Sequence, residues 1–387
     1  MKIAWFCIPA HGHTNPTLGL VKEMTEAGHE VIYFSFEQFR EKIENAGAQF
    51  ISCDDCEIEM EDRENSDRVG KDIAFSTELL VKSTLALDDM VAEKVRQIKP
   101  DLIVSDSVAY WGKLTAMKYN IPYVSSTTTF AFNNYSSKYM QHGIGELFKM
   151  LFAMPKVNRQ IKKLRDKGYP VKSIFEIVSN DNATNTIVYT SKEFQPCADT
   201  FSDKYCFVGP SIRPISCEMK KTAEKTIYIS MGTVVKNKEI YRNCIEALGN
   251  TDYQVILSLG ENAEDYGEVP ENIEVYPSVD QMAVLAITDV FLTHCGMNST
   301  SEALYYEVPL VMFPQTPEQG AVARRVEELG AGKMLASADK ETIRNTIESV
   351  LSDAKYKAAA KDISAGFKRC GGVRAAKEFL EGIQHES

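Results

Sequence analysis

Short runs of β-branched and aromatic residues alternate along the chain with longer amphipathic stretches. This alternation is typical of β–α units, in which helices connect the parallel strands of one sheet. In the first half of the chain, strands are predicted over residues 2–8, 30–36, 101–106, 122–127 and 186–190. In the second half, they are predicted over residues 226–230, 254–259, 273–276, 289–294, 310–314 and 333–335.

Between these strands, apolar residues recur at the spacing expected for amphipathic helices. Leu18, Val21 and Met24 recur three residues apart before Gly28 ends the first such pattern. Residues 63–100, after an initial loop, and residues 133–179 are also predicted to be helical, and the chain closes with two long helices from about residue 339. Self-similarity with a period of ~20–50 residues is absent, which excludes a solenoid.

The alternation is interrupted once, over residues 209–225, which carry two prolines, several charges and no periodicity. Such a stretch is typical of a linker. A chain of 387 residues also exceeds the size at which one hydrophobic core keeps growing. We therefore predict two doubly wound α/β domains, residues 1–208 and 226–387, facing each other across a cleft, with the last helix able to cross back to the first domain.

The charge and composition of the chain indicate which kinds of molecule it does not bind. The chain has 43 Lys and Arg residues against 54 Asp and Glu residues, a formal net charge of −11. Nucleic acids and anionic lipids both attract clustered cations, so neither is an expected partner. An apolar content of 44% excludes disorder. Because neither a bilayer-spanning run of ~20 apolar residues nor a signal peptide is recognisable, we expect a cytoplasmic protein.

The nine cysteines are scattered through the chain. Cys53 and Cys56 have the spacing of half a zinc site, but a second C-x-x-C or H-x-x-H pair is missing from the sequence. We therefore expect free thiols, as in a reducing compartment, and no structural metal.

Polar side chains follow the ends of the predicted strands, where open parallel sheets bind ligands. His11 and His13 follow the first strand, ahead of Asn15 and Pro16, which are predicted to be the N-cap and first residue of a helix. An imidazole placed there is a natural general base near neutral pH. The alternative for His13 is an ordinary histidine of a surface loop.

Asp106 ends the predicted strand 101–106 and should share a sheet edge with His13. A buried carboxylate at that edge can orient a histidine and stabilise its imidazolium form. Asp is also among the strongest N-cap residues, so Asp106 can equally begin the helix predicted over residues 108–119.

Residues 293–302 combine a strand end, a glycine turn and a helix that opens with small polar residues. The free N–H groups and the dipole of such a helix bind anions, and His294 is a candidate cation beside them. The competing structural explanation is that Ser299 and Glu302 form a capping box.

Two further turns of the second half repeat this chemistry. Thr316 and Gln319 also have capping-box spacing, whereas Glu318 beside Gln319 offers a carboxylate and an amide to a pair of sugar hydroxyls. The turn at residues 230–233 ends in Gly232 and Thr233, which suits a phosphate. Dinucleotide oxidoreductases, P-loop enzymes and α/β-hydrolases are excluded, since their G-x-G-x-x-G, Walker and G-x-S-x-G motifs are missing.

Taken together, these motifs resemble family-1 glycosyltransferases of the GT-B fold, most closely the bacterial macrolide and flavonoid glucosyltransferases. The resemblance covers nearly the whole chain. It is carried by His11-Gly-His13-Thr-Asn-Pro16, Ser105-Asp106-Ser-Val-Ala, Cys206-Phe-Val-Gly-Pro210, Ser230-Met-Gly-Thr233, Val279-Asp-Gln281, His294-Cys-Gly-Met-Asn-Ser299, Glu302, Pro309, Pro314 and Glu318-Gln319.

The resemblance implies a role for each matching residue. His13 rather than His11 would deprotonate the acceptor hydroxyl, and Asp106 would orient it. The implied donor contacts are His294, Gly296, Asn298, Ser299 and the adjacent Thr233 for the diphosphate, Glu302 for the ribose, Val279 and Gln281 for the base, and Glu318 and Gln319 for the sugar.

The implied activity is an inverting transfer of a hexose, glucose being expected, from a UDP-sugar to a small hydrophobic acceptor such as a macrolide or flavonoid. Because the helix end and His294 would hold the leaving diphosphate, no metal or other cofactor is expected. The turn at residues 278–281 departs from the family's Trp-Val-Pro-Gln, since Ser278 replaces the stacking indole and Asp280 the proline. Uracil over thymine is therefore an expectation about the donor.

Two rival classes stay open at this point. One is another sugar-nucleotide enzyme of the same fold, such as an epimerase or hydrolase, and the other is a non-catalytic GT-B partner protein. The acceptor pocket would lie in the first domain, where its candidate lining is Trp111, Phe130, Phe132 and residues 148–154, although a helical Met/Phe stripe is more often core.

Overall fold

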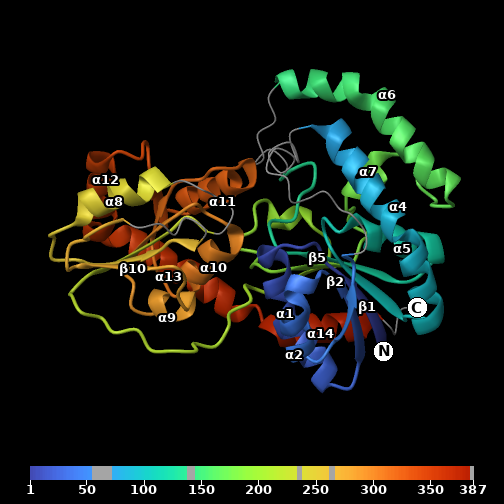
Figure 1. Cartoon of the computed structure of the whole chain (residues 1–387), viewed down its shortest axis with the longest axis horizontal. Coiled ribbons are helices and arrows are strands. Elements are labelled where there is room, and N and C mark those ends of the chain that lie inside the picture. The colour runs from blue at the N-terminus through green and yellow to red at the C-terminus, as the bar shows by residue number, and fades with distance from the viewer. Residues whose placement is uncertain (55–71, 137–143, 233–237, 261–265, 384–387) are drawn as a thin grey trace. The chain divides into compact units, whose positions relative to one another are not determined.

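The computed structural model describes residues 1–54, 72–136, 144–232, 238–260 and 266–383, the side chains of residues 144–151 excepted (Figure 1). The chain divides into two compact units. Unit 1 comprises Met1–Tyr189, Cys197–Val208 and Gly371–Ser387, and unit 2 comprises Thr190–Pro196 and Gly209–Cys370.

Unit 1 is built on a parallel sheet that has seven strands in the described part of the chain. At its centre Ala4 pairs with Ile32 on one side and Ile103 on the other. Central strands of such a sheet are buried on both faces and are therefore apolar without alternation. The spatial order of the strands is β3 (Gln49–Ser52), β2 (Glu30–Ser35), β1 (Lys2–Phe6), β4 (Leu102–Asp106), β5 (Tyr123–Thr127), β6 (Thr186–Val188) and β7 (Tyr205–Phe207).

Unit 2 repeats this design with a parallel sheet of six described strands. Their order is β10 (Ile273–Tyr276), β9 (Gln254–Ser258), β8 (Thr226–Ser230), β11 (Val290–Thr293), β12 (Leu310–Met312) and β13 (Gly332–Met334). The strand order reverses between β1 and β4 in unit 1 and between β8 and β11 in unit 2. Ligands bind at such switch points, outside the carboxyl ends of the strands. The two doubly wound sheets confirm the predicted α/β fold class.

Helices cover both faces of each sheet. On one face of the unit 1 sheet, Trp5 packs with Leu20 of α1 and Leu380 of α14, and on the other face Phe6 packs with Leu87 of α4. The helices of unit 1 are α1 (His11–Glu26), α2 (Arg40–Asn45), α4 (Ile73–Ile98), α5 (Tyr110–Tyr119), α6 (Ile144–Asp166), α7 (Ile174–Val178) and α14 (Gly372–Ile383), with short 3₁₀ turns at Glu37–Phe39 and Ala198–Thr200. Those of unit 2 are α8 (Lys238–Leu248), α9 (Gln281–Leu285), α10 (Met297–Tyr305), α11 (Pro317–Glu328), α12 (Lys340–Ser352) and α13 (Ala354–Arg369).

The edge strands and the end of the chain differ from the predicted elements. Strands β3 and β7 were not predicted, because both are short edge strands that pair on one side, of four and three residues. The chain closes with three helices rather than two. Asp353 interrupts the first long stretch and caps α13 by accepting the N–H of Lys355. Gly371, at φ 81°, lies between α13 and α14, which begins at Gly372.

Residues 209–225 form neither helix nor strand, and they belong to unit 2. The N–H and the hydroxyl of Ser216 both donate to Oδ2 of Asp280, at 2.6 and 2.5 Å. The segment predicted to be a linker is thus attached to the turn that precedes α9. Among the described residues, none of the helices has the length and apolar character needed to cross a membrane.

Candidate functional site

His13 lies in the first turn of α1, directly after the end of β1. The helix begins at His11 rather than at Pro16, so the predicted helix start is wrong. The carbonyl of Ala10, the N-cap residue, accepts the N–H groups of both His13 and Thr14 at 3.0 Å, which closes the first turn without a side-chain cap from the described residues. Pro16 is tolerated inside the helix, where it removes a single backbone donor.

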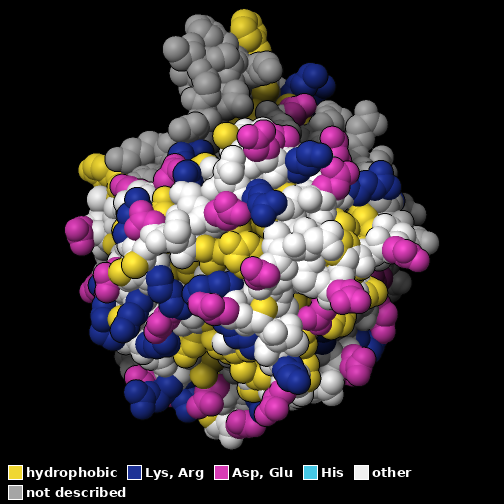
Figure 2. Space-filling model, turned by 90° about the vertical axis from the view of Figure 1, so that its left-hand side faces the viewer, with side chains coloured by type: hydrophobic (Ala, Val, Ile, Leu, Met, Phe, Trp, Pro, Cys, Tyr) yellow, Lys and Arg dark blue, Asp and Glu magenta, His cyan; other side chains and the backbone are white. Residues whose placement is uncertain are grey.

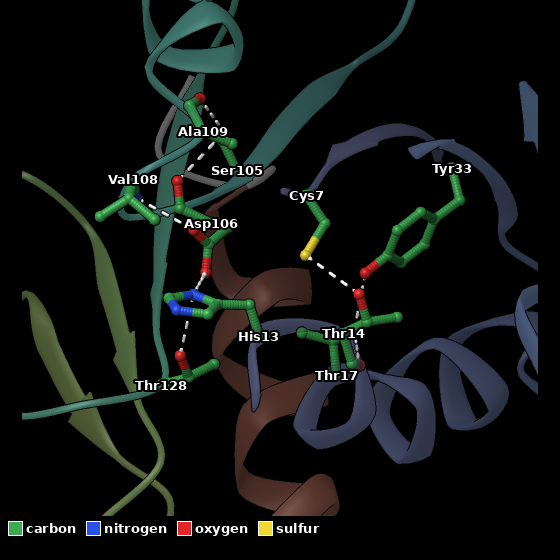
Figure 3. Close-up of polar contacts among 10 residues, drawn as sticks. All are labelled: Cys7, His13, Thr14, Thr17, Tyr33, Ser105, Asp106, Val108, Ala109 and Thr128. Carbon is green, nitrogen blue, oxygen red and sulfur yellow. Dashed lines mark hydrogen bonds and ion pairs between the residues drawn. The ribbon is translucent and has the colours of Figure 1, made fainter. Parts of the chain in front are cut away.

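Asp106 is the last residue of β4, on the other side of the switch point. Its Oδ2 lies 2.7 Å from Nδ1 of His13, and its Oδ1 accepts the N–H of Val108 at 3.0 Å (Figure 3). The carboxylate is fully buried, whereas the imidazole is 25% exposed. The alternative role as an N-cap is wrong, because α5 begins at Tyr110 with Ala109 as its N-cap.

This contact determines which nitrogen of His13 can act as a base. An ionised carboxylate only accepts hydrogen bonds, so Nδ1 must carry the proton and Nε2 presents its lone pair. The buried charge of Asp106 is felt by its neighbour Tyr110, whose pKa is raised to about 12 by burial and, secondarily, by that charge.

Thr128 is a site residue that the sequence reasoning did not identify. Its hydroxyl lies 3.3 Å from Nδ1 of His13 and its side chain is buried (Figure 3). Because Nδ1 donates to Asp106, the Thr128 oxygen can only serve as a second acceptor. The signal was present in the sequence, since Thr128 follows β5 just as His13 and Asp106 mark the ends of β1 and β4.

A chain of buried polar contacts fixes the first turn of α1 against the sheet. The Sγ of Cys7 lies 3.5 Å from Oγ1 of Thr14, and Oγ1 of Thr17 lies 2.9 Å from the hydroxyl of Tyr33 (Figure 3). Burial raises the pKa of the Cys7 thiol far above its usual value, so it stays neutral. These groups therefore position the helix that carries His13.

In unit 2 the corresponding turn follows β11. Cys295, at φ 64°, turns the chain, and Gly296 is the N-cap of α10. The predicted capping box is wrong, since Ser299 is the third helical residue and no described side chain caps the helix. The first N–H groups of α10 are therefore available to an anion, as at other helix N-termini. Asn298 lies within this first turn and is partly buried.

The His294 imidazole is packed between two glycines. A Cβ at Gly232 would lie 2.5 Å from its Cε1, and one at Gly296 would lie 2.6 Å from its Nε2. Its Nδ1 is buried and makes no hydrogen bond of normal geometry to a described residue, although the backbone of Ser230 is close enough to the ring to oppose the effect of burial on its pKa. A buried nitrogen of this kind normally finds a partner, so it is suited to a ligand atom. Thr233, the adjacent predicted residue, lies outside the described residues.

Burial lowers the pKa of His294 to about 4. Desolvation disfavours the charged imidazolium, so the side chain is neutral at pH 7 in the ligand-free protein. His294 is therefore not a cation in the ligand-free protein. The residue can offer a hydrogen bond to a ligand, while the attraction for negative charge comes from the helix end.

Gln281, at the start of α9, connects two elements of the predicted nucleotide site. Its Nε2 donates to Oε2 of Glu302 and, at 3.2 Å, to Oγ of Ser299, both on α10. Its Oε1 accepts the hydroxyl of Tyr228 at 3.2 Å. Burial raises the pKa of Glu302 to about 7, although the Gln281 hydrogen bond opposes this rise. Val279, partly buried, lies in the turn just before α9.

The turn before α11 forms half of the predicted capping box, since Thr316 caps the helix but the Gln319 side chain bonds the residue before the N-cap. Oγ1 of Thr316 accepts the N–H of Gln319 at 3.3 Å, and Oε1 of Gln319 accepts the N–H of Gln315 at 2.8 Å. Glu318 is exposed in the same turn. The structure thus brings the predicted residues of unit 2, Thr233 aside, to the carboxyl edge of one sheet.

The described residues contain no group of three or more His, Cys, Asp or Glu side chains that could hold a metal ion. Cys53 is buried and forms no disulfide, and Cys56 lies outside the described residues.

Comparison with known proteins yields several related chains. Residues 242–367 match the family described as Erythromycin biosynthesis protein CIII-like, C-terminal domain. The chain is 32% identical to YojK of Bacillus subtilis, called an uncharacterized UDP-glucosyltransferase, covering 98% of this chain and 96% of the relative. It is also 32% identical to the NDP-glycosyltransferase YjiC of Bacillus subtilis, covering 100% and 98% of the two chains.

More distant relatives include the demethyllactenocin mycarosyltransferase of Streptomyces fradiae, which is 28% identical over 98% of this chain and 86% of its own length. Among solved structures, the calicheamicin glycosyltransferase CalG4 is similar with a TM-score of 0.83 and 25% identity, covering 99% of this chain and 98% of that chain.

Proposed function

The chain belongs to the family-1 UDP-glycosyltransferases and has the GT-B fold, and we propose that it transfers glucose from UDP-glucose to a hydroxyl of a hydrophobic natural product with inversion. The observation that carries this proposal is the buried Asp106 carboxylate 2.7 Å from Nδ1 of His13 at the switch point of unit 1. A histidine held in this way is prepared to accept a proton at Nε2.

In the proposed reaction, Nε2 of His13 takes the proton of the acceptor hydroxyl as its oxygen attacks the anomeric carbon. A new C–O bond forms on the face opposite the diphosphate while the bond from that carbon to the phosphate oxygen breaks, which inverts the configuration. The resulting imidazolium is stabilised by Asp106, as in the histidine–aspartate pairs of hydrolases.

The leaving UDP carries the charge that develops in the transition state. The N–H groups at the start of α10 would accept this charge, and the orphaned Nδ1 of His294 would donate a hydrogen bond in its neutral Nδ1–H tautomer. Glu302 would bind the ribose hydroxyls, next to the base-binding residues Val279 and Gln281. Glu318 and Gln319 would hold the sugar, with the Gln319 amide nitrogen as the donor because its oxygen is used in the cap.

The names of relatives support the choice of donor and acceptor. YojK is called a UDP-glucosyltransferase, which supports UDP and glucose. The mycarosyltransferase acts on demethyllactenocin and CalG4 on calicheamicin by their names, which supports a hydrophobic natural product as the acceptor. A panel of UDP- and TDP-sugars incubated with phenolic and macrolide acceptors, analysed by mass, tests both substrates. Sugar release without a glycosylated acceptor would contradict the proposal.

Replacing Thr128 with valine should lower kcat by about 2–10-fold, the usual value of a single hydrogen bond. Valine keeps the shape of the side chain but removes the oxygen that helps Nδ1 of His13 stabilise its positive charge. Thr128→Ser, which keeps the oxygen, is the matched control and should retain activity. Equal kcat in the two variants would show that the hydroxyl does not assist His13.

Donor binding should strengthen as the pH rises through 7. Glu302, whose pKa is raised to about 7, is protonated below that value and ionised above it, and only the ionised carboxylate accepts hydrogen bonds from both ribose hydroxyls. Its ionised fraction rises from about 10% to about 90% between pH 6 and 8, so the Kd of UDP-glucose measured by calorimetry should fall by up to about ninefold. Glu302→Gln should bind with a flat profile, and a pH dependence that persists in it would refute this assignment.

Transfer should also continue undiminished after exhaustive chelation with EDTA. Under the proposal the leaving charge is held by the helix end and His294, so a divalent ion is not needed. The measurement is the initial rate before and after chelation, and a rate that only added Mg²⁺ or Mn²⁺ restores would contradict the assignment.

A further inference from the structure

Helix α6 of unit 1 has one buried and one exposed face. Val157, Ile161 and Leu164 form the buried face and pack in a cluster with Leu80 and Val81 of α4. Figure 1 shows α6 along the outside of α4, as the outermost helix of this part of unit 1. The side chains on the opposite face therefore point to solvent.

The exposed side of α6 carries an aromatic residue followed by basic residues toward the C-terminal end of the helix. Phe152 is 84% exposed, and Lys156, Arg159 and Lys163 follow at the spacing that places residues on one side of a helix. Lys162, Arg165 and Lys167 add three exposed cations, so residues 156–167 contain six cations and a single carboxylate, Asp166. Lys162 and Arg165 lie on an adjoining side of the helix, and Lys167 follows its last residue. We call Phe152 together with these six cations the α6 face.

Among the residues that the structure describes, no ion pair neutralises the charge of the α6 face. The side chains of its six cations form no ion pair or hydrogen bond there, and the hydrogen bonds of Lys163, Arg165 and Lys167 are made by the backbone. Among the carboxylates on the elements packed against α6, Glu176 of α7 accepts the N–H of Lys172 at 2.8 Å, and Asp88 of α4 pairs with Lys118 at 2.6 Å. By contrast, the face of the molecule in Figure 2 shows basic and acidic side chains intermixed.

We propose that the α6 face docks the protein on an anionic lipid bilayer. Each Lys or Arg close to an anionic membrane surface changes partitioning by about fivefold. Lys156, Arg159 and Lys163 lie on the side of Phe152 and can approach that surface together with it. An exposed aromatic ring gains free energy by leaving water for the headgroup–acyl boundary. A polyanion without an apolar phase would use the cations but leave Phe152 in water, so the combination favours a bilayer.

This inference revises the expectation drawn from the net charge of −11. Charges more than about 8 Å apart are largely screened at physiological ionic strength, so a bilayer senses the local charge of α6 rather than that of the whole chain. Docking would also bring the enzyme to the phase in which a hydrophobic acceptor concentrates, a benefit that rests on the proposed function.

The test is flotation of the full chain with vesicles of phosphatidylglycerol and phosphatidylcholine, and with vesicles of phosphatidylcholine alone. The wild type should bind the anionic vesicles only and dissociate at 0.5 M salt. Arg159→Gln/Lys163→Gln should weaken binding by about 25-fold. The matched control is Lys357→Gln/Lys361→Gln, which removes two exposed cations at the same spacing from α13 of unit 2 and should bind as the wild type does.

Phe152→Ser should bind anionic vesicles several-fold more weakly than the wild type at moderate salt, where insertion of the apolar ring contributes a larger share of the affinity. Melting temperatures of the variants equal to that of the wild type exclude unfolding as the cause. The proposal fails if the wild type does not bind anionic vesicles, or if both double variants lose binding to the same extent. It also fails if the protein binds heparin or duplex DNA through the α6 face but does not bind vesicles. The last result would identify another polyanion as the partner. None of these outcomes bears on the transfer reaction, which is measured separately.

Discussion

Replacing His13 with alanine should lower kcat for transfer to an aliphatic alcohol by about 10²–10⁴-fold, the usual contribution of a general base. An alcohol is too weakly acidic to lose its proton unaided at pH 7, and Nε2 of His13 is the proposed proton acceptor. Because a phenol ionises more easily than an alcohol, kcat for transfer to a phenolic acceptor should fall by a smaller factor. Initial rates with the two acceptor classes at saturating donor provide the measurement.

The same turn of α1 supplies the matched control. The ring of His11 lies edge-on to Phe39 at 4.9 Å, so His11→Ala removes an imidazole from the same segment without touching Asp106. This variant should keep transfer within a few-fold of the wild type. If His13→Ala stays active while its melting temperature is unchanged, His13 is not the base and the proposed mechanism fails.

Replacing Gly296 with alanine should raise the Kd of UDP-glucose by about tenfold or more. The backbone at Gly296, at φ −59°, suits any residue, so the effect arises from the added methyl group alone. Its Cβ would lie 2.6 Å from Nε2 of His294, and the imidazole must move away from the start of α10. Displacing a packed ring typically costs about 1–3 kcal/mol, which here would be lost from donor binding or from folding.

Calorimetry with UDP-glucose, together with thermal unfolding, separates these two losses. Gly382→Ala is the control, since a Cβ there meets nothing within 4 Å and the substitution should be silent. Unchanged donor affinity in Gly296→Ala would mean that the position of His294 is irrelevant to the donor. His294→Ala should then also bind normally, which provides a second check on the assignment.

The central strands and the placement of the site on a sheet edge could be predicted because they depend on local patterns. Strands β1 and β8 contain the uninterrupted apolar runs Ile3–Phe6 and Ile227–Ile229, and such runs are typical of the middle of a parallel sheet. The edge strands β3 and β7 could not be found in this way, because strands of four and three residues are too short to show a periodic pattern. The start of α1 was misplaced for a similar reason, as Pro16 is a strong local signal that tertiary packing overrode.

The sequence by itself determined which chemical groups are present and which strand each one follows. That was enough to predict His13 and Asp106 as partners across 93 residues, and to name the residues of the turn before α10. Only the tertiary structure decided the protonation states of the site residues and the further side chains that contact them. Burial keeps His294 neutral in the ligand-free protein and raises the pKa of Glu302 to about 7, and the fold places Thr128 beside His13. The physical reason is that desolvation and hydrogen-bond distance depend on residues remote in the chain, which a local pattern does not encode.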